Sequence, residues 1–165
     1  MVVVVIIGIL ASIAVPAINK YMARSRQTEV MTNLGALYTT NKAFHSEYGT
    51  YATWFGVIGF APEGRLRYRI GFDLNFPADG AALGGFGYAA GLPAAPGNTN
   101  NTGDYCAAIP ANCSLDIIAP AVPAAADCTA ASFLALGTGF IGGVISDEWT
   151  IDQTKDLNHT QDGTF

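Results

Sequence analysis

Residues 1–18, MVVVVIIGILASIAVPAI, contain no charged side chain, and this stretch limits what the chain can fold into more than any other. About 20 consecutive apolar residues are long enough to cross a bilayer as a helix. A signal peptide that is removed would begin with a basic segment, and no Lys or Arg precedes Val2. The stretch therefore favours a retained membrane-compatible segment over a cleaved signal.

The apolar stretch continues without a linker into a second helical pattern. From Tyr21 onward apolar residues recur at helical spacing, many of them seven residues apart. We expect one helix from Met1 to Tyr48, about 70 Å long at 1.5 Å per residue, closed by Gly49 in the left-handed conformation. Its second half is expected to pack on a globular head through Val30, Met31, Leu34, Leu37, Tyr38 and Phe44.

Two later segments alternate apolar and polar residues, as half-buried strands do. Residues 65–70 place arginines against Leu66, Tyr68 and Ile70, and we expect this apolar face to pack on the helix. Residues 147–152, DEWTID, alternate Trp149 and Ile151 with polar residues. Together they predict an α+β fold in which the long N-terminal helix packs on a small antiparallel sheet.

The arginines of the first strand leave two interpretations open. One is a solvated sheet face, and the other is a contact with acids of a neighbouring copy. The candidate charges for such a contact are Arg65, Arg67, Arg69, Asp147, Glu148 and Asp152.

Residues 77–126 are rich in Gly, Ala, Pro and Asn and predict a loop-rich region. The expected organisation is an apolar helix segment over 1–23, its amphipathic continuation over 24–48, and a β-rich head over 49–165. The candidate disulfide residues are Cys106, Cys113 and Cys128, whose spacing matches no zinc or haem pattern. We expect Cys113 to pair with either Cys106 or Cys128.

Composition and motifs argue against several classes of function. A net charge of −5 does not suit a nucleic-acid coat, so no specific nucleic-acid binding is predicted. No cysteine has an evident base beside it, and LGTGFIGG lacks the lysine of a phosphate-binding loop. The acids near residue 150 lack the spacing of a calcium loop. We therefore expect no enzyme, no cofactor and no metal.

The first 51 residues, MVVVVIIGILASIAVPAINKYMARSRQTEVMTNLGALYTTNKAFHSEYGTY, resemble the long N-terminal helix of a bacterial type IV major pilin. IGFAPEG followed by RLRYRIGF is similar to the loop and first strand of one subgroup of these pilins, and DEWTIDQTKDLNHTQDG to their last strands. The family is cut after a glycine to leave a methylated phenylalanine, followed within a few residues by a glutamate. This sequence starts downstream of both, so we expect the mature protein to have a few residues more.

The resemblance implies a subunit that polymerises with copies of itself into an extracellular pilus for surface attachment and twitching motility. Its expected partners are the inner membrane before assembly and the pilus assembly and retraction machinery. The segment expected in the membrane and then in the filament core comprises Val2, Val3, Val4, Val5, Ile6, Ile7, Ile9, Leu10, Ile13, Val15 and Ile18. A pseudopilin of a type II secretion system and a membrane-anchored binding protein that never polymerises remain as alternatives.

Three residues within the apolar segment weaken its helix: Gly8, Ser12 and Pro16. Proline has no amide hydrogen for the carbonyl four residues earlier, glycine has low helix propensity, and serine can bond its local backbone. We expect the helix to persist in the bilayer, where unpaired backbone groups find no water. In the assembled fibre, by contrast, residues 8–16 are expected to lose regular helix.

Overall fold

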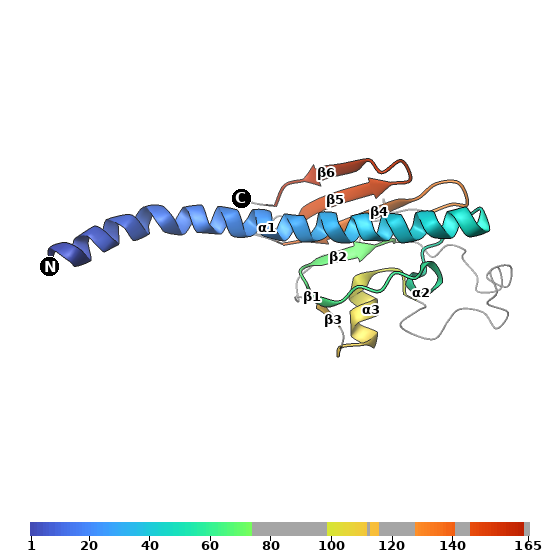
Figure 1. The fold of residues 1–165 in the computed structure, drawn as a ribbon, viewed down its shortest axis with the longest axis horizontal. Coiled ribbons are helices and arrows are strands. Elements are labelled where there is room, and N and C mark those ends of the chain that lie inside the picture. The colour runs from blue at the N-terminus through green and yellow to red at the C-terminus, as the bar shows by residue number, and fades with distance from the viewer. Residues whose placement is uncertain (74–98, 112, 116–127, 141–145, 164–165) are drawn as a thin grey trace.

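The computed structural model describes residues 1–73, 99–111, 113–115, 128–140 and 146–163. One long helix lies along a small head that contains two sheets and two short helices (Figure 1). The elements are α1 (Val2–Tyr48), α2 (Phe55–Ile58), β1 (Gly64–Leu66), β2 (Tyr68–Gly71), α3 (Thr102–Ala108), β3 (Cys113–Leu115), β4 (Leu134–Gly139), β5 (Asp147–Asp152) and β6 (Leu157–Gln161). The predicted α+β fold is confirmed.

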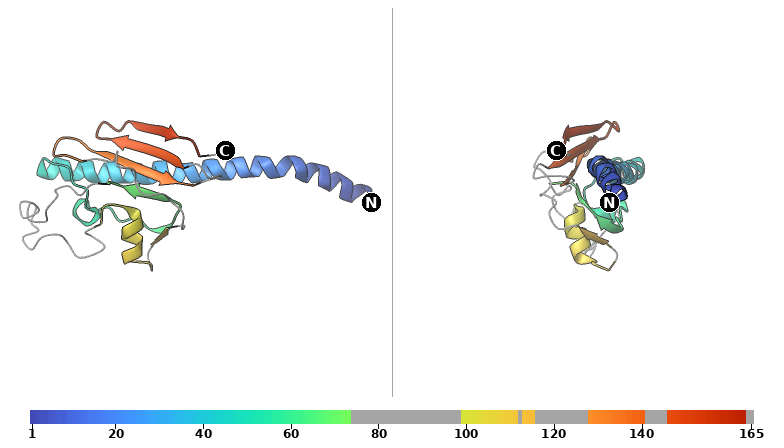
Figure 2. Two further views of the ribbon diagram at one scale, coloured as in Figure 1. Left: turned by 180° about the vertical axis from the view of Figure 1, so that it is seen from behind. Right: turned by 90° about the vertical axis from the view of Figure 1, so that its left-hand side faces the viewer.

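Helix α1 is continuous from Val2 to Tyr48, as the unbroken helical pattern predicted. It ends at Gly49, whose φ of 73° lies in the left-handed region and whose N–H donates to the carbonyl of His45 at 2.8 Å. The N-terminal part of α1 extends beyond the head and curves, whereas the C-terminal part lies straight against the head (Figure 1). Seen along α1, the sheets and α3 lie on one side of it (Figure 2).

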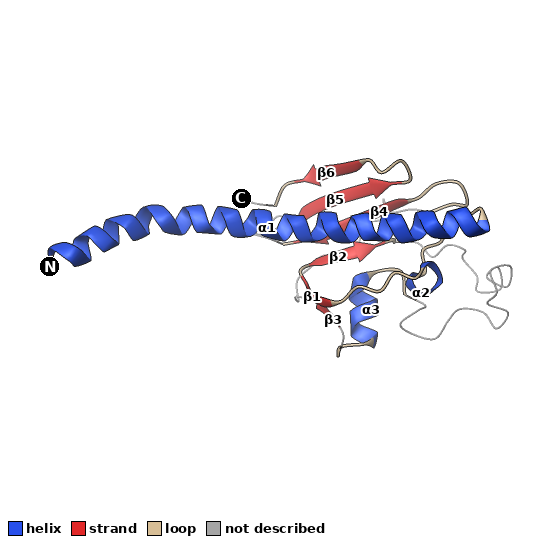
Figure 3. Ribbon diagram, viewed as in Figure 1, coloured by secondary structure: helices blue, strands red, loops and turns tan. Residues whose placement is uncertain are grey.

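The larger sheet has the strand order β2-β4-β5-β6, with every neighbouring pair antiparallel (Figure 3). Strand β4 lies next to α1 at Gly137. A Cβ atom at this position would overlap the side chain of Val30 and would lie 3.5 Å from Ile70 and Leu34. Glycine at 137 therefore lets the sheet approach the helix closely, and the helix contributes directly to the core of the head.

The smaller sheet corrects the prediction of a single strand over residues 65–70. The apolar residues there are buried as expected, but β1 and β2 are separate strands. Strand β1 pairs in parallel with β3, and β2 pairs with β4. Between them, the amide of Arg67 donates to Oε1 of Glu29 on α1 at 2.8 Å. Because the Arg67 amide bonds to the helix, it does not bond to another strand, and the chain passes from its pairing with β3 to its pairing with β4 at this residue.

The region 77–126, predicted as loop-rich, contains α3 and β3, which corrects that prediction in part. Asn101 is the N-cap of α3: its Oδ1 accepts from the amide of Asp104 at 3.1 Å, and its Nδ2 donates to Asp104 Oδ2 at 2.8 Å. The first of these bonds satisfies one of the amides that a helix start leaves without an intrahelical partner. Residues 77–98, 112 and 116–126 lie outside the described residues.

Candidate functional site

The first half of α1 presents an apolar surface that none of the described residues covers. The eleven apolar side chains predicted for the membrane and filament core are between 51% and 73% exposed. An 18-residue window of this helix has a mean hydropathy of 2.6 and is not buried at all, so the helix is long and apolar enough to cross a membrane. A soluble monomer rarely exposes so much contiguous apolar surface, which marks a site of membrane or protein interaction.

The second half of the same helix forms the core of the head. Val30, Leu34, Leu37 and Phe44 are buried, and Met31 and Tyr38 are partly buried against the same core. Phe133, just before β4, packs its ring against Tyr38 at 6.2 Å and against Tyr51 at 5.0 Å, centroid to centroid. The two halves of α1 therefore have different roles: the C-terminal half is part of the core of the head, and the N-terminal half exposes an apolar surface that a membrane or another protein can cover.

The residues predicted to weaken the helix lie within α1 in the single chain. Gly8, Ser12 and Pro16 all fall between Val2 and Tyr48, and the helix is unbroken there. The hydroxyl of Ser12 donates to the carbonyl of Ile9 at 2.7 Å, which is the local backbone bond expected of this residue type. The loss of helix in the assembled fibre stays a prediction.

A buried carboxylate joins the head to the helix, and sequence reasoning placed this residue wrongly. Asp147 was predicted among charges that reach a neighbouring copy, but it is fully buried. Its position at the start of β5 puts it on the same face as Trp149 and Ile151, because strand side chains alternate. The sequence contained this signal: Asp147 lies two residues before Trp149 and four before Ile151, so its side chain points to the same buried face of the strand.

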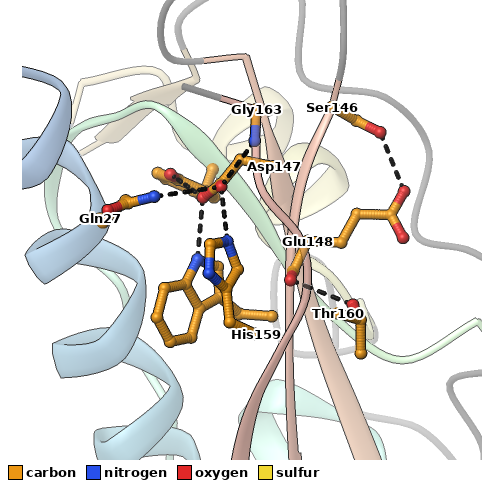
Figure 4. A network of polar contacts seen from close by, with 9 residues as sticks. Gln27, Ser146, Asp147, Glu148, His159, Thr160 and Gly163 are labelled. Carbon is orange, nitrogen blue, oxygen red and sulfur yellow. Dashed lines mark hydrogen bonds and ion pairs between the residues drawn. The ribbon is translucent and has the colours of Figure 1, made fainter. Parts of the chain in front are cut away.

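The carboxylate of Asp147 accepts hydrogen bonds from five donors in different parts of the chain (Figure 4). They are Tyr68 Oη at 2.5 Å, Trp149 Nε1 at 2.8 Å, His159 Nε2 at 2.8 Å, the Gly163 amide at 3.1 Å and Gln27 Nε2 at 3.2 Å. The His159 ring also stacks on the Trp149 ring, with centroids 4.1 Å apart. One carboxylate thus ties α1, β2, β5, β6 and the segment after β6 together.

This arrangement shifts the pKa values of its members in opposite directions. Burial acts to raise the pKa of Asp147, but hydrogen bonds from Tyr68, Gly163, His159 and Trp149 outweigh it and lower the pKa below its ordinary value. Burial and the bond to Asp147 raise the pKa of Tyr68. The stable state is therefore an ionised Asp147 that accepts from a neutral Tyr68.

Asp147, His159 and Asp162 also place three potential metal-ligand atoms within 4.8 Å of one another. Both oxygens of Asp147 already accept from the donors named above, which compete with an ion for the same lone pairs. The hydrogen bonds of Asp147 therefore indicate a structural role for this cluster, which holds several elements together.

The remaining candidate charges lie at the surface or near it. Arg65 is exposed, and Arg67 and Arg69 are half-buried. The buried Nε of Arg69 has no hydrogen-bond partner. Glu148 accepts from the Ser146 hydroxyl at 3.0 Å, and Asp152 accepts from its own turn, as described below. Except for Asp147, each of these charged residues is at least partly exposed, so a neighbouring molecule can contact it.

The predicted disulfide is confirmed as Cys106–Cys113, with Cα atoms 5.1 Å apart. It joins α3 to the start of β3 and so holds the smaller sheet to the helix beside it. Cys128 is buried and is not part of this disulfide.

Comparison with known proteins gives two findings. The family model described as Type IV pilin PilA matches residues 21–76, which comprise the packing half of α1, then α2, β1 and β2. The type IV major pilin protein PilA of Myxococcus xanthus (strain DK1622) is 54% identical over 72 residues, which are 42% of this chain and 33% of that protein. The chain therefore spans about a third of the length of this curated relative. The predicted resemblance is confirmed.

Proposed function

We propose that this chain is a structural subunit that polymerises into an extracellular type IV pilus, in keeping with the match of residues 21–76 to the family model described as Type IV pilin PilA. The observation that carries the proposal is the division of α1. Its second half is built into the head, and its first half exposes apolar side chains over its whole length. A filament of parallel helices, with the heads outside, buries such a surface while leaving each head folded.

The same surface explains how a subunit is stored before assembly. In the inner membrane, lipid tails cover the apolar half, and in the filament neighbouring helices cover it. Lipid tails are as apolar as valine and leucine, so the transfer exchanges one apolar environment for another. The gain of about 1.5–3 kcal/mol for burying an apolar side chain applies only against water. Assembly and retraction therefore require work, which pilus assembly and retraction machinery supplies in this proposal.

The head carries the contacts that set the filament lattice and the outer surface. We include the arginine contact here: Arg69, a half-buried residue of β2, would pair with Glu148 or Asp152 of a neighbouring copy. Reversing both charges, as in Arg69→Glu with Glu148→Arg, should restore a pilus yield that either single variant lowers. Single variants with full yield would instead identify a solvated sheet face. Surface attachment and twitching motility are the cellular roles proposed for the filament.

The test compares Ile9→Lys with the matched control Ser46→Lys, which adds the same charge at an exposed position beside the head. Cells that carry each variant are imaged by electron microscopy, and filaments are sheared and quantified. A lysine in the middle of the apolar half should abolish filaments, because a buried unpaired charge is costly. The control should assemble normally.

The outcomes separate the alternatives. Wild-type cells without extracellular filaments, with the chain retained in the membrane fraction, would show an anchored protein that does not polymerise. Loss of protein export on deletion, without loss of surface filaments, would show a pseudopilin. Equal filament yield in both lysine variants would show that the apolar half of α1 is not the assembly surface.

A further inference from the structure

A polar groove lies where α1 passes β1, at the end of the head from which the apolar half of α1 emerges. It has a volume of about 470 Å³ and is lined by Ser25, Thr28, Glu29, Thr32 and Asn33 of α1, by Glu63 just before β1, and by Arg65 and Leu66 of β1. The side chain of Glu63 is exposed and has no hydrogen bond or ion pair with any described residue. The groove thus contains two carboxylates and one guanidinium. Glu29 already accepts from the Arg67 amide, so Glu63 is the carboxylate that a partner's cation can reach.

The turn between β5 and β6 presents a lysine, whose charge is opposite to that of Glu63, and its conformation is held by hydrogen bonds. Oδ1 of Asp152 accepts from the Thr154 amide at 2.8 Å, the Thr154 hydroxyl at 2.6 Å and the Asp156 amide at 3.0 Å. The Lys155 amide donates to the Asp152 carbonyl at 3.1 Å, and Lys155 has a φ of 68°. The exposed Lys155 ammonium has no partner among the described residues. The turn therefore presents Lys155 and Asp156 in a defined conformation.

These two features lie at opposite ends of the head. Strand β5 begins at Asp147, which is bonded to Gln27 near the groove end of the head, and ends at Asp152. At about 3.4 Å per residue, this places the turn roughly 17 Å further along α1. Figure 1 shows the β5–β6 connection toward the C-terminal end of α1 and β1 toward the opposite end of the head. Within one chain, Lys155 and Glu63 are therefore kept apart.

We propose that the β5–β6 turn of one subunit docks in the groove between α1 and β1 of the next, pairing Lys155 with Glu63. The inference rests on the proposed function and adds the partner and the contacts of this surface. Copies that lie parallel and shifted along the helix axis bring one end of a head against the other end of its neighbour. The two surfaces differ, so the contact is head-to-tail and repeats without closing, as a filament requires.

Cysteine cross-linking in intact filaments tests the contact directly. The variant Glu63→Cys/Lys155→Cys is oxidised on sheared filaments and separated by non-reducing electrophoresis. A head-to-tail contact should give a ladder of dimers, trimers and larger chains. Glu47→Cys/Lys155→Cys is the matched control, because Glu47 lies near the end of α1 at the same end of the head as the turn. It should give no ladder, and the buried Cys128 is common to both variants.

Charge reversal gives a second measurement that does not depend on thiol geometry. Lys155→Glu and Glu63→Lys should each lower the yield of sheared filaments about two- to fivefold, which is the range expected for one exposed ion pair. The double variant should recover it. Filaments that give no ladder, together with a double variant no better than the single ones, overturn the inference and leave the proposed function intact. Absence of filaments from the wild type would overturn the proposed function itself.

Discussion

Asp147 shows how one residue fixes the position of several elements. A buried carboxylate is tolerated only where its charge is compensated by hydrogen bonds, and this one has donors from α1, β2, β5, β6 and the segment after β6. Tyr68, Trp149 and Gly163 are buried, and they depend on the carboxylate because water does not replace it; Gln27 is half-buried and His159 is exposed. Asp147 is therefore expected to contribute more to stability than its single charge suggests.

Replacing Asp147 by alanine should lower the free energy of unfolding by about 3 kcal/mol, because buried donors lose their acceptor. Urea denaturation of the full chain in detergent, followed by tryptophan fluorescence, measures the change. Glu148→Ala is the control, since Glu148 is the next residue in β5, is half-buried and makes no hydrogen bond to Asp147 among the described contacts; it should change stability by about 0.5 kcal/mol or less. Equal losses in the two variants would contradict the role assigned to Asp147.

The lowered pKa of Asp147 predicts a dependence of stability on acid. Its carboxylate ionises more readily in the folded than in the unfolded chain, where its pKa is about 3.9. Its contribution is therefore present above that value and is lost as the pH falls through the folded pKa. The stability difference between the wild type and Asp147→Asn should shrink between about pH 5 and pH 3. A difference that stays constant over this range would show that the ionised form is not what stabilises the fold.

At the scale of elements, the sequence predicted α1 well because its signals are local. Helical spacing, the absence of a linker and Gly49 as a left-handed C-cap all act within a few residues. Strands β2 and β5 were found from alternation. The side chains that pack on the head followed from the same periodicity.

Two elements escaped sequence reasoning for physical reasons. The central strand β4, LALGTG, has the composition of a loop, yet Gly137 is required where Val30 packs and Gly139 where Tyr68 packs. Helix α3 lies in a segment rich in turn formers, and its capping pair, Asn101 and Asp104, was the overlooked signal. The parallel pairing of β1 with β3 depends on a contact distant in sequence, which no local pattern contains.

The apolar half of α1 is the element in which a change of structure on assembly is expected. A proline at 16 leaves the Ser12 carbonyl without its helical partner, at about 3 kcal/mol, and Gly8 adds about 1 kcal/mol relative to alanine. Lipid provides no alternative partners, but a packed filament allows the segment to extend. Cryo-electron microscopy of the fibre should show non-helical backbone over residues 8–16 and helix from Asn19 to Tyr48. Density for a straight, unbroken helix from Val2 to Tyr48 would contradict this.

For the whole molecule, the two halves of α1 predict two kinds of stability in the proposed filament. The head has its own core and a disulfide, whereas the apolar halves, exposed in the single chain, would be held only by each other. Mild detergent should therefore dissolve sheared filaments into folded subunits, because its apolar tails replace the neighbouring helices. Sedimentation measures the loss of filaments, and near-UV circular dichroism measures the retained head. Filaments that resist detergent until the head unfolds would show that head contacts dominate.

The continuity of α1 also bears on how a filament carries mechanical load. In the proposed filament, tension along the fibre axis would enter a subunit through its apolar half. It would pass into the head through the same helix, which has one face buried against the head between Ala23 and Phe44. Such a force acts in shear over the whole length of this contact, so many side chains resist it together. Pulling from one edge of the sheet would break contacts one after another. A subunit in which a single rod serves as both anchor and core is thus suited to strong pulling.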